Sequence, residues 1–142
     1  TPKLGLLEAR NEKQEARIEE KMVIQTFRDL LVYQRSYDVM IGLYKKTREF
    51  PKDELYGLTS QIKRASTSIP LNIAEGYGKR ENTAEFKRFL LMAIGSCDEM
   101  KVLLDICKDL GLIDDQYHEN LEHEYDEIGK MLRGLHQKWM SY

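Results

Sequence analysis

The sequence predicts an all-α protein, an antiparallel up-down-up-down four-helix bundle with a proline-kinked second helix. Apolar residues recur at alternating spacings of three and four along four segments, and no alternation of period two extends beyond a few residues. The four segments have similar lengths and short connecting loops, which favours antiparallel packing with crossing angles near 20°. With 142 residues, 42% of them apolar, the chain is long enough for one domain with a buried core.

The first two helices are delimited by proline and glycine. We expect the first helix over about residues 26–49, with Pro51 ending it because the residue before a proline avoids the α region. The second helix starts near Asp53, and Gly76 and Gly78 supply its C-terminal stop. Its apolar face consists of Leu55, Leu58, Ile62, Ala65, Ile69 and Ile73.

The third helix has the clearest signals. Asn82 is the expected N-cap, with Glu85 at capping-box spacing, and Gly111 closes the helix. A stripe of apolar residues spaced alternately four and three apart runs along the helix, and we call it the seam: Phe86, Leu90, Ala93, Cys97, Met100, Leu104 and Cys107. A second stripe lies beside the seam: Phe89, Met92, Ser96, Leu103, Ile106 and Leu110. Together they are too wide for one partner helix, so we expect identical chains to share this face. The fourth helix opens at Asp114 or Asp115 and extends to Trp139.

Pro70 is the main irregularity in the second helix. It removes one backbone donor and presses on a carbonyl one turn earlier, at a cost of about 3 kcal/mol. Hydroxyls at 66–68 can bond back to carbonyls and ease a bend. We therefore predict a kinked or broken helix at Pro70, with Asn72 and Glu75 facing a neighbouring helix or subunit.

Gly95 lies in the middle of the third helix, where glycine costs about 1 kcal/mol relative to alanine. Small residues surround it, and the second helix carries a similar small-residue patch. Close approach of two backbones is the expected compensation, and the alternative is a tolerated glycine with no packing role.

Residues 1–21 differ from residues 22–142, which form the predicted bundle domain. They are good helix formers but polar on all sides, so an isolated helix would be marginal. Residues 1–21 are either an appended or upstream-encoded extension or a true N-terminal arm.

No segment reaches the roughly 18 apolar residues of a membrane span. Cys97 and Cys107 are about 15 Å apart on one helix, too far for a disulfide, which favours a reducing, cytoplasmic location.

Catalytic and metal-binding patterns are weak, and the prediction is a non-enzyme with no catalytic residue, cofactor or metal. Three histidine-carboxylate pairs have i, i+4 spacing on the fourth helix: His118 with Glu122, Glu119 with His123, and His123 with Glu127. A metal can bind such pairs, but no second helix is expected to present inward carboxylates at matching heights. A solvated acidic face is the favoured interpretation. The cysteines lie on the core seam without a nearby histidine, so neither is expected to be an activated nucleophile.

Charge is distributed unevenly although the formal net charge is only −2. The segment 57–92 carries six basic and three acidic residues, whereas 109–128 carries eight acidic residues and no lysine or arginine. The candidate nucleic-acid-binding residues are Lys79, Arg80, Lys87 and Arg88, with Tyr77 beside them to stack on an unpaired base. The alternative is that these cations pair with a neighbouring subunit or simply solubilise the protein.

Several segments together resemble a known family: GLTSQIKRASTSIPLNIAEGYGKR, LLVYQRSYD and FPKDELYGL before it, and FKRFLLMAIGSCDEMKVLLDICKDLGLI after it. They resemble the four-helix-bundle proteins named for 23S ribosomal RNA intervening sequences. The resemblance implies a bundle that assembles into a ring, often a pentamer, and it implies no reaction. Similar pentamers, the accessory proteins of diversity-generating retroelements, associate with reverse transcriptase and nucleic acid, an analogy at the level of fold.

Two functions are therefore expected. One is a homo-oligomeric adaptor that binds structured RNA or another nucleic acid through basic residues around the ring. The other is a homo-oligomeric scaffold that recognises a protein partner and has no nucleic-acid role. Pro70, Asn72, Glu75, Gly76 and Gly95 are the expected structural or assembly residues in both cases, and neither involves a membrane.

Overall fold

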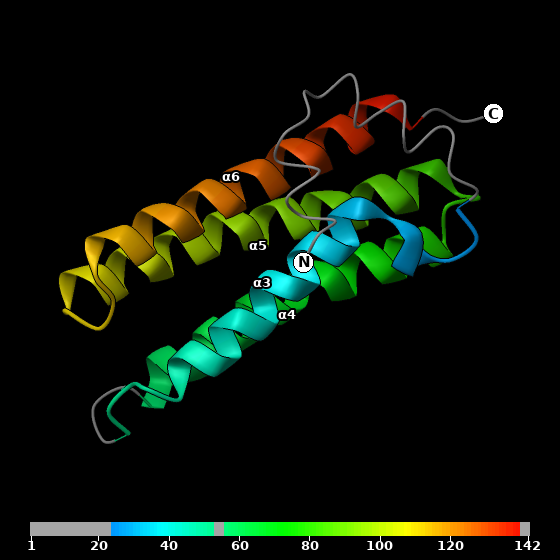
Figure 1. Ribbon diagram of the computed structural model, residues 1–142. Helices are drawn as coiled ribbons and strands as arrows, with labels where there is room; N and C mark the ends of the chain where they lie inside the picture. The colour runs from blue at the N-terminus through cyan, green and yellow to red at the C-terminus, as the bar shows by residue number, and fades with distance from the viewer. Residues whose placement is uncertain (1–23, 53–55, 140–142) are drawn as a thin grey trace.

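The computed structural model describes residues 24–52 and 56–139. A short 3-10 turn, η1 (Phe27–Asp29), precedes four helices: α3 (Leu31–Thr47), α4 (Tyr56–Gly78), α5 (Thr83–Asp109) and α6 (Asp115–Lys138). Figure 1 shows α5 and α6 lying side by side, with α3 and α4 forming the other pair. No strand occurs within the described ranges. The prediction of an all-α four-helix bundle is confirmed, while the predicted extension at 1–21 lies outside the described residues.

Polar side-chain pairs fix the register between α4 and α5. Arg64 Nη2 lies 2.9 Å from Glu99 Oε1, and the Ser68 hydroxyl donates to the Ser96 hydroxyl. Because residue numbers rise along α4 as they fall along α5, these two helices run in opposite directions. The small-residue patches predicted in both helices do face each other, through the two serines.

The helix ends follow the cap signals. The Asn82 side chain accepts a 3.1 Å hydrogen bond from the backbone N–H of Glu85, as the N-cap prediction requires. After α5, Gly111 adopts φ +74°, a left-handed conformation that favours glycine. The N–H of Leu112 then donates to the carbonyl of Cys107 at 2.9 Å, which satisfies a carbonyl at the helix end.

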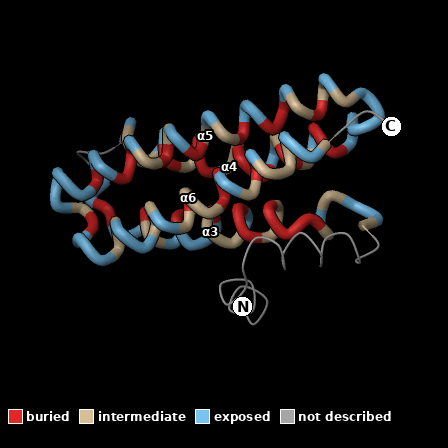
Figure 2. The backbone as a smooth tube through the Cα atoms, turned by 90° about the horizontal axis from the view of Figure 1, so that it is seen from above, coloured by how far each residue is buried: buried red, intermediate tan, exposed pale blue. Residues whose placement is uncertain are grey.

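The predicted seam of α5 forms the centre of the core. All seven of its residues are buried, and Figure 2 shows the buried positions on the inward sides of the helices. The second stripe divides: Phe89 and Leu103 are buried, whereas Met92, Ile106 and Leu110 are exposed. One protomer therefore leaves part of the apolar surface of α5 uncovered.

Helix α4 continues through Pro70, so the predicted break is wrong, and a kink at this position stays a prediction. Pro70 is buried, and the preceding hydroxyls of Ser66 and Ser68 each donate to the carbonyl three residues earlier. The Asn72 side chain donates to the Ser68 carbonyl at 2.8 Å. These bonds go to the carbonyls of Lys63, Ala65 and Ser68. The carbonyl that loses its donor to Pro70 is that of Ser66, one turn earlier, and none of the three bonds replaces that donor. Glu75 is exposed on the protomer.

The close contact between backbones occurs at Gly76 and not at Gly95. A Cβ at Gly95 would have no heavy atom within 4 Å, and the residue is exposed, so its predicted packing role within the protomer is wrong. A Cβ at Gly76 would lie 2.7 Å from Phe89 Cβ and 3.1 Å from Phe86 Cδ1. Gly76 thus lies inside α4, where it sets the separation between α4 and α5.

One ion pair with a buried member joins α6 to α3, and one buried hydroxyl of α6 has no hydrogen-bond partner in the described part of the chain. The Arg35 side chain is 2% exposed and forms a two-point contact with Glu124, at 3.1 Å from Nε and 3.3 Å from Nη2. The hydroxyl of Tyr125 is buried and has no hydrogen-bond partner among the described residues. Burial raises the pKa of Tyr125 well above its ordinary value, so the phenol stays neutral.

In the part of the chain that the structure describes, no helix combines the length and apolar character that crossing a membrane requires.

Candidate functional site

The turn between α4 and α5 carries a cluster of cations on aromatic rings. We call it the basic rim, and it consists of Lys79, Arg80, Lys87 and Arg88. Lys79 Nζ lies 4.7 Å from the centroid of the Phe89 ring, and the Arg88 guanidinium lies 4.6 Å from the same centroid. Such cation-π contacts fix the position of the charges without neutralising them. Lys79 and Arg88 thus share one ring, whereas no ring contact within the described ranges involves Lys87, so a single cluster of all four residues stays a prediction.

Most charges of the basic rim have no acidic partner. Arg88 pairs with Glu85, Nε to Oε2 at 2.7 Å, and this contact raises the pKa of Arg88 and lowers the pKa of Glu85. Among the described residues, no carboxylate lies within 4.0 Å of the side-chain nitrogens of Lys79, Arg80 or Lys87. Three cations per protomer can thus meet an anion from outside.

Tyr77 does not have the role predicted for it. Its side chain is 6% exposed and packs edge-on against Phe86, with ring centroids 6.4 Å apart. The Arg80 guanidinium lies 4.1 Å from the centroid of the Tyr77 ring and donates to the Tyr77 carbonyl at 2.9 Å. An unpaired base has no open ring to stack on here. Tyr77 instead holds Arg80 at the rim.

The rim and the acidic segment lie at opposite ends of the bundle. Helix α5 joins the two ends and has 27 residues, a span of about 40 Å. At the rim end, the Trp139 ring packs edge-on against Phe86, with centroids 4.6 Å apart. The acidic start of α6 lies beyond Gly111, at the far end of α5. Anions are therefore attracted to one end and cations to the other.

The thiols do not form a nucleophilic site. Cys97 and Cys107 are free and buried, at 1% and 0% exposure. Burial raises the pKa of Cys97 to about 12 and the pKa of Cys107 to about 11. Both thiols are therefore protonated at neutral pH and lack the thiolate that nucleophilic attack requires.

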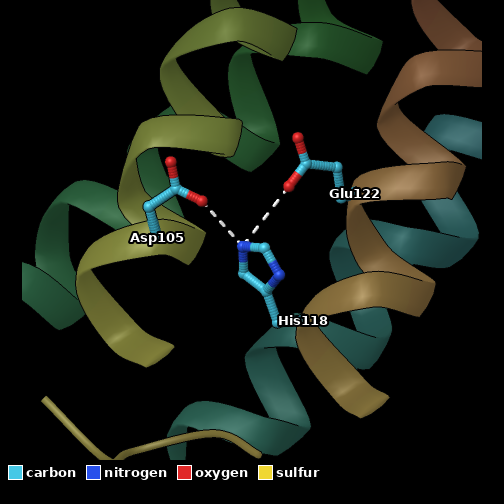
Figure 3. A group of neighbouring side chains, drawn as sticks. All are labelled: Asp105, His118 and Glu122. Atoms are coloured by element: carbon cyan, nitrogen blue, oxygen red, sulfur yellow. Dashed lines mark hydrogen bonds and ion pairs between the residues drawn. The ribbon is translucent and has the colours of Figure 1, made fainter. Parts of the chain in front are cut away.

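One histidine meets carboxylates from two helices. His118 Nε2 lies 2.7 Å from Oδ1 of Asp105 on α5 and 3.3 Å from Oε2 of Glu122 on α6, as Figure 3 shows. The carboxylate from the second helix, that of Asp105, is exposed and not inward, a surface contact that the sequence prediction did not include. Asp105 lies outside the apolar stripes of α5, and only the register of α5 against α6 reveals that it meets His118.

Comparison with known proteins identifies the family. The model of the 23S rRNA-intervening sequence protein family matches residues 28–134. A solved structure with the same fold is a protein with unknown function from the S23 ribosomal protein family of Bacteroides thetaiotaomicron. It has a TM-score of 0.66 and 24% identity, over 76% of this chain and 96% of that chain. None of the curated proteins matches the sequence. The family match spans most of the chain and all four helices, and the protein belongs to the 23S rRNA-intervening sequence protein family.

Proposed function

We propose that this protein is a non-catalytic homo-oligomer whose basic rim binds the phosphates of structured RNA. The observation that carries the proposal is the set of unpaired cations held at one end of the bundle. Phosphate contacts by lysine and arginine supply most of the affinity of proteins that bind nucleic acid without base contacts. A ring of five copies would collect the four rim cations of each chain, about twenty charges, into one band.

An uncovered apolar surface supports the assembly of identical chains. We call it the α4/α5 apolar face, and its exposed residues are Leu71, Leu91, Met92, Val102, Ile106 and Leu110. Val102 and Leu110 are 59% and 60% exposed, which is high for large apolar side chains on a monomeric protein. The Ser68–Ser96 hydrogen bond places Leu71 one helical turn away, at the height of Met92. A second copy would remove this surface from water.

We expect the assembly to depend on the α4/α5 apolar face. Light scattering of the unmodified protein at micromolar concentration should give a multiple of 16.7 kDa. Replacing Val102 and Ile106 together by glutamate should shift the mass toward 16.7 kDa, because carboxylates would be buried at the contact. The matched control is Ile41→Glu, an exposed apolar residue of α3. A solitary chain in the unmodified protein would contradict the proposal.

Charge reversal at the basic rim tests nucleic-acid binding. Binding to mixed structured RNA and duplex DNA is measured across salt concentrations, with all four rim residues replaced by glutamate. In the unmodified protein, a plot of log affinity against log salt concentration should have a negative slope, of about 0.7–0.9 for each phosphate contacted. The variant should lose this slope and at least tenfold in affinity at low salt.

The control reverses the same number of charges elsewhere. Lys45, Arg48, Lys108 and Lys130 are exposed and lie outside the rim, so their replacement by glutamate makes the same change in net charge. If both variants lose binding equally, net charge and not the rim is responsible. Circular dichroism confirms folding in each case, because Lys79 and Arg88 also cover Phe89.

A second candidate function is a protein-binding scaffold without a nucleic-acid role. The α4/α5 apolar face favours it, because an exposed apolar surface can receive another protein as well as a second copy. Absence of RNA and DNA binding at low salt, together with a stable oligomer, would support this function over the first.

A further inference from the structure

We propose that Asp105, His118 and Glu122 form a binding site for a divalent transition metal such as Zn²⁺, at the end of the bundle opposite the basic rim. One atom from each side chain, two carboxylate oxygens and His118 Nε2, lies within 4.8 Å of the others. Figure 3 shows both carboxylates directed at the same ring nitrogen. The ligands come from α5 and α6, so a bound ion would join the two helices across their turn.

The separations suit a small ion after a minor adjustment. Zn²⁺ binds nitrogen and oxygen at about 2.0–2.2 Å, and tetrahedral geometry places neighbouring ligand atoms about 3.4 Å apart. The distance from His118 Nε2 to Glu122 Oε2 is already 3.3 Å. The distance to Asp105 Oδ1 is 2.7 Å and has to widen, which is easy for a side chain that is 62% exposed. The imidazole itself is only 13% exposed, so its position is held by packing.

Charge also favours a divalent ion over a proton. A proton on His118 leaves the three groups with a net charge of −1, because two carboxylates face one imidazolium. A divalent ion on the neutral imidazole balances both carboxylates. The segment 109–128, with eight acidic residues and no lysine or arginine, adds a negative field around the site. The nearby cation Lys101 is occupied by its ion pair with Asp126.

The ligand set indicates which metals fit. One imidazole nitrogen and two carboxylate oxygens are typical ligands of zinc and of first-row metals such as cobalt and nickel. Magnesium and calcium prefer an all-oxygen set, so they should bind more weakly. Three protein ligands leave at least one position for water. The ion is proposed to stabilise the contact between α5 and α6, and no reaction is assigned to it.

Calorimetric titration of the full chain, purified without a histidine tag, with Zn²⁺ tests the site. We expect one ion per chain, and a loss of at least tenfold in affinity in Asp105→Asn and in His118→Gln. The thermal midpoint should rise with Zn²⁺ in the unmodified protein and not in Asp105→Asn. The matched control is His123→Gln, because His123 has the same spacing to acidic residues on α6 but belongs to no group of three possible ligands in the described part of the chain. Its affinity should not change.

Asp105→Asn separates the proposed site from a simple pair on one helix. If Asp105→Asn binds Zn²⁺ as tightly as the unmodified protein, the ion is held by His118 and Glu122 on α6 without Asp105, and the proposal is wrong. Absence of Zn²⁺ binding to the unmodified protein also overturns it, and the cluster is then only a polar contact between helices. Both results leave the test of the basic rim unaffected, since the two sites lie at opposite ends of α5.

Discussion

Glu124→Ala is expected to lower the free energy of unfolding by about 3–5 kcal/mol, the typical cost of leaving a buried charge without its partner. The Arg35 side chain is 2% exposed, and Glu124 is its carboxylate partner. Removing Glu124 leaves the guanidinium in the interior between α3 and α6, with a 3.9 Å contact to Met131 Sδ as a weak replacement. Urea denaturation followed by circular dichroism measures the change.

Two further variants decide whether burial causes this loss. Glu49→Ala removes an exposed partner of Lys46, at 2.8 Å, and should change stability by no more than about 0.5 kcal/mol. Replacing both Arg35 and Glu124 by leucine should recover much of the loss, because no unpaired charge remains. If Glu124→Ala is as mild as Glu49→Ala, the guanidinium reaches water and the pair is not a buried one.

Gly76→Ala is expected to destabilise the bundle by about 1–3 kcal/mol, the usual cost of overpacking a core. The new Cβ would lie 2.7 Å from Phe89 Cβ, an atom that a side-chain rotation cannot move. Helices α4 and α5 would have to separate, which also disturbs the aromatic rings that hold the basic rim. Denaturant unfolding measures the stability, and RNA binding measures the effect on the rim.

The control for this substitution is Gly42→Ala. Gly42 is exposed within α3, and a Cβ there would meet no heavy atom within 4 Å. Alanine has the higher helix propensity, so stability should rise by up to about 1 kcal/mol. A rise in stability for Gly76→Ala as well would show that α4 can shift away from Phe89 at little cost.

Local signals predicted the helices well because each depends on a few neighbouring residues. The Asn82 cap and the stop at Gly111 were recognisable from sequence, since one side chain or one backbone conformation decides them. The buried seam of α5 followed from its periodicity. The continuity of α4 through Pro70 was missed, because packing of the flanking turns, in which Ile69 and Ile73 are fully buried, outweighs the local cost of the proline.

Contacts between helices were predicted less well because periodicity assigns faces and does not assign register. The sequence assigned the close contact to Gly95 and a helix stop to Gly76, yet it is Gly76, inside α4, that closely faces another helix. The pairing of Arg35 with Glu124 and the approach of Asp105 to His118 join residues that are far apart in the chain. Lys79 and Arg88 are close in sequence and do lie on one ring, that of Phe89. The burial of Tyr77 was not, because it depends on the packing of Phe86.

The two buried thiols make α5 a built-in reporter of fluctuations. Because neither sulfur reaches solvent, an alkylating reagent can modify Cys97 or Cys107 only when the helices around it part transiently. The rate of alkylation of each cysteine therefore measures how often the helices around that part of α5 separate. If RNA or zinc binding suppresses this separation, alkylation should become slower. The two cysteines report on two positions along α5, and no label has to be introduced.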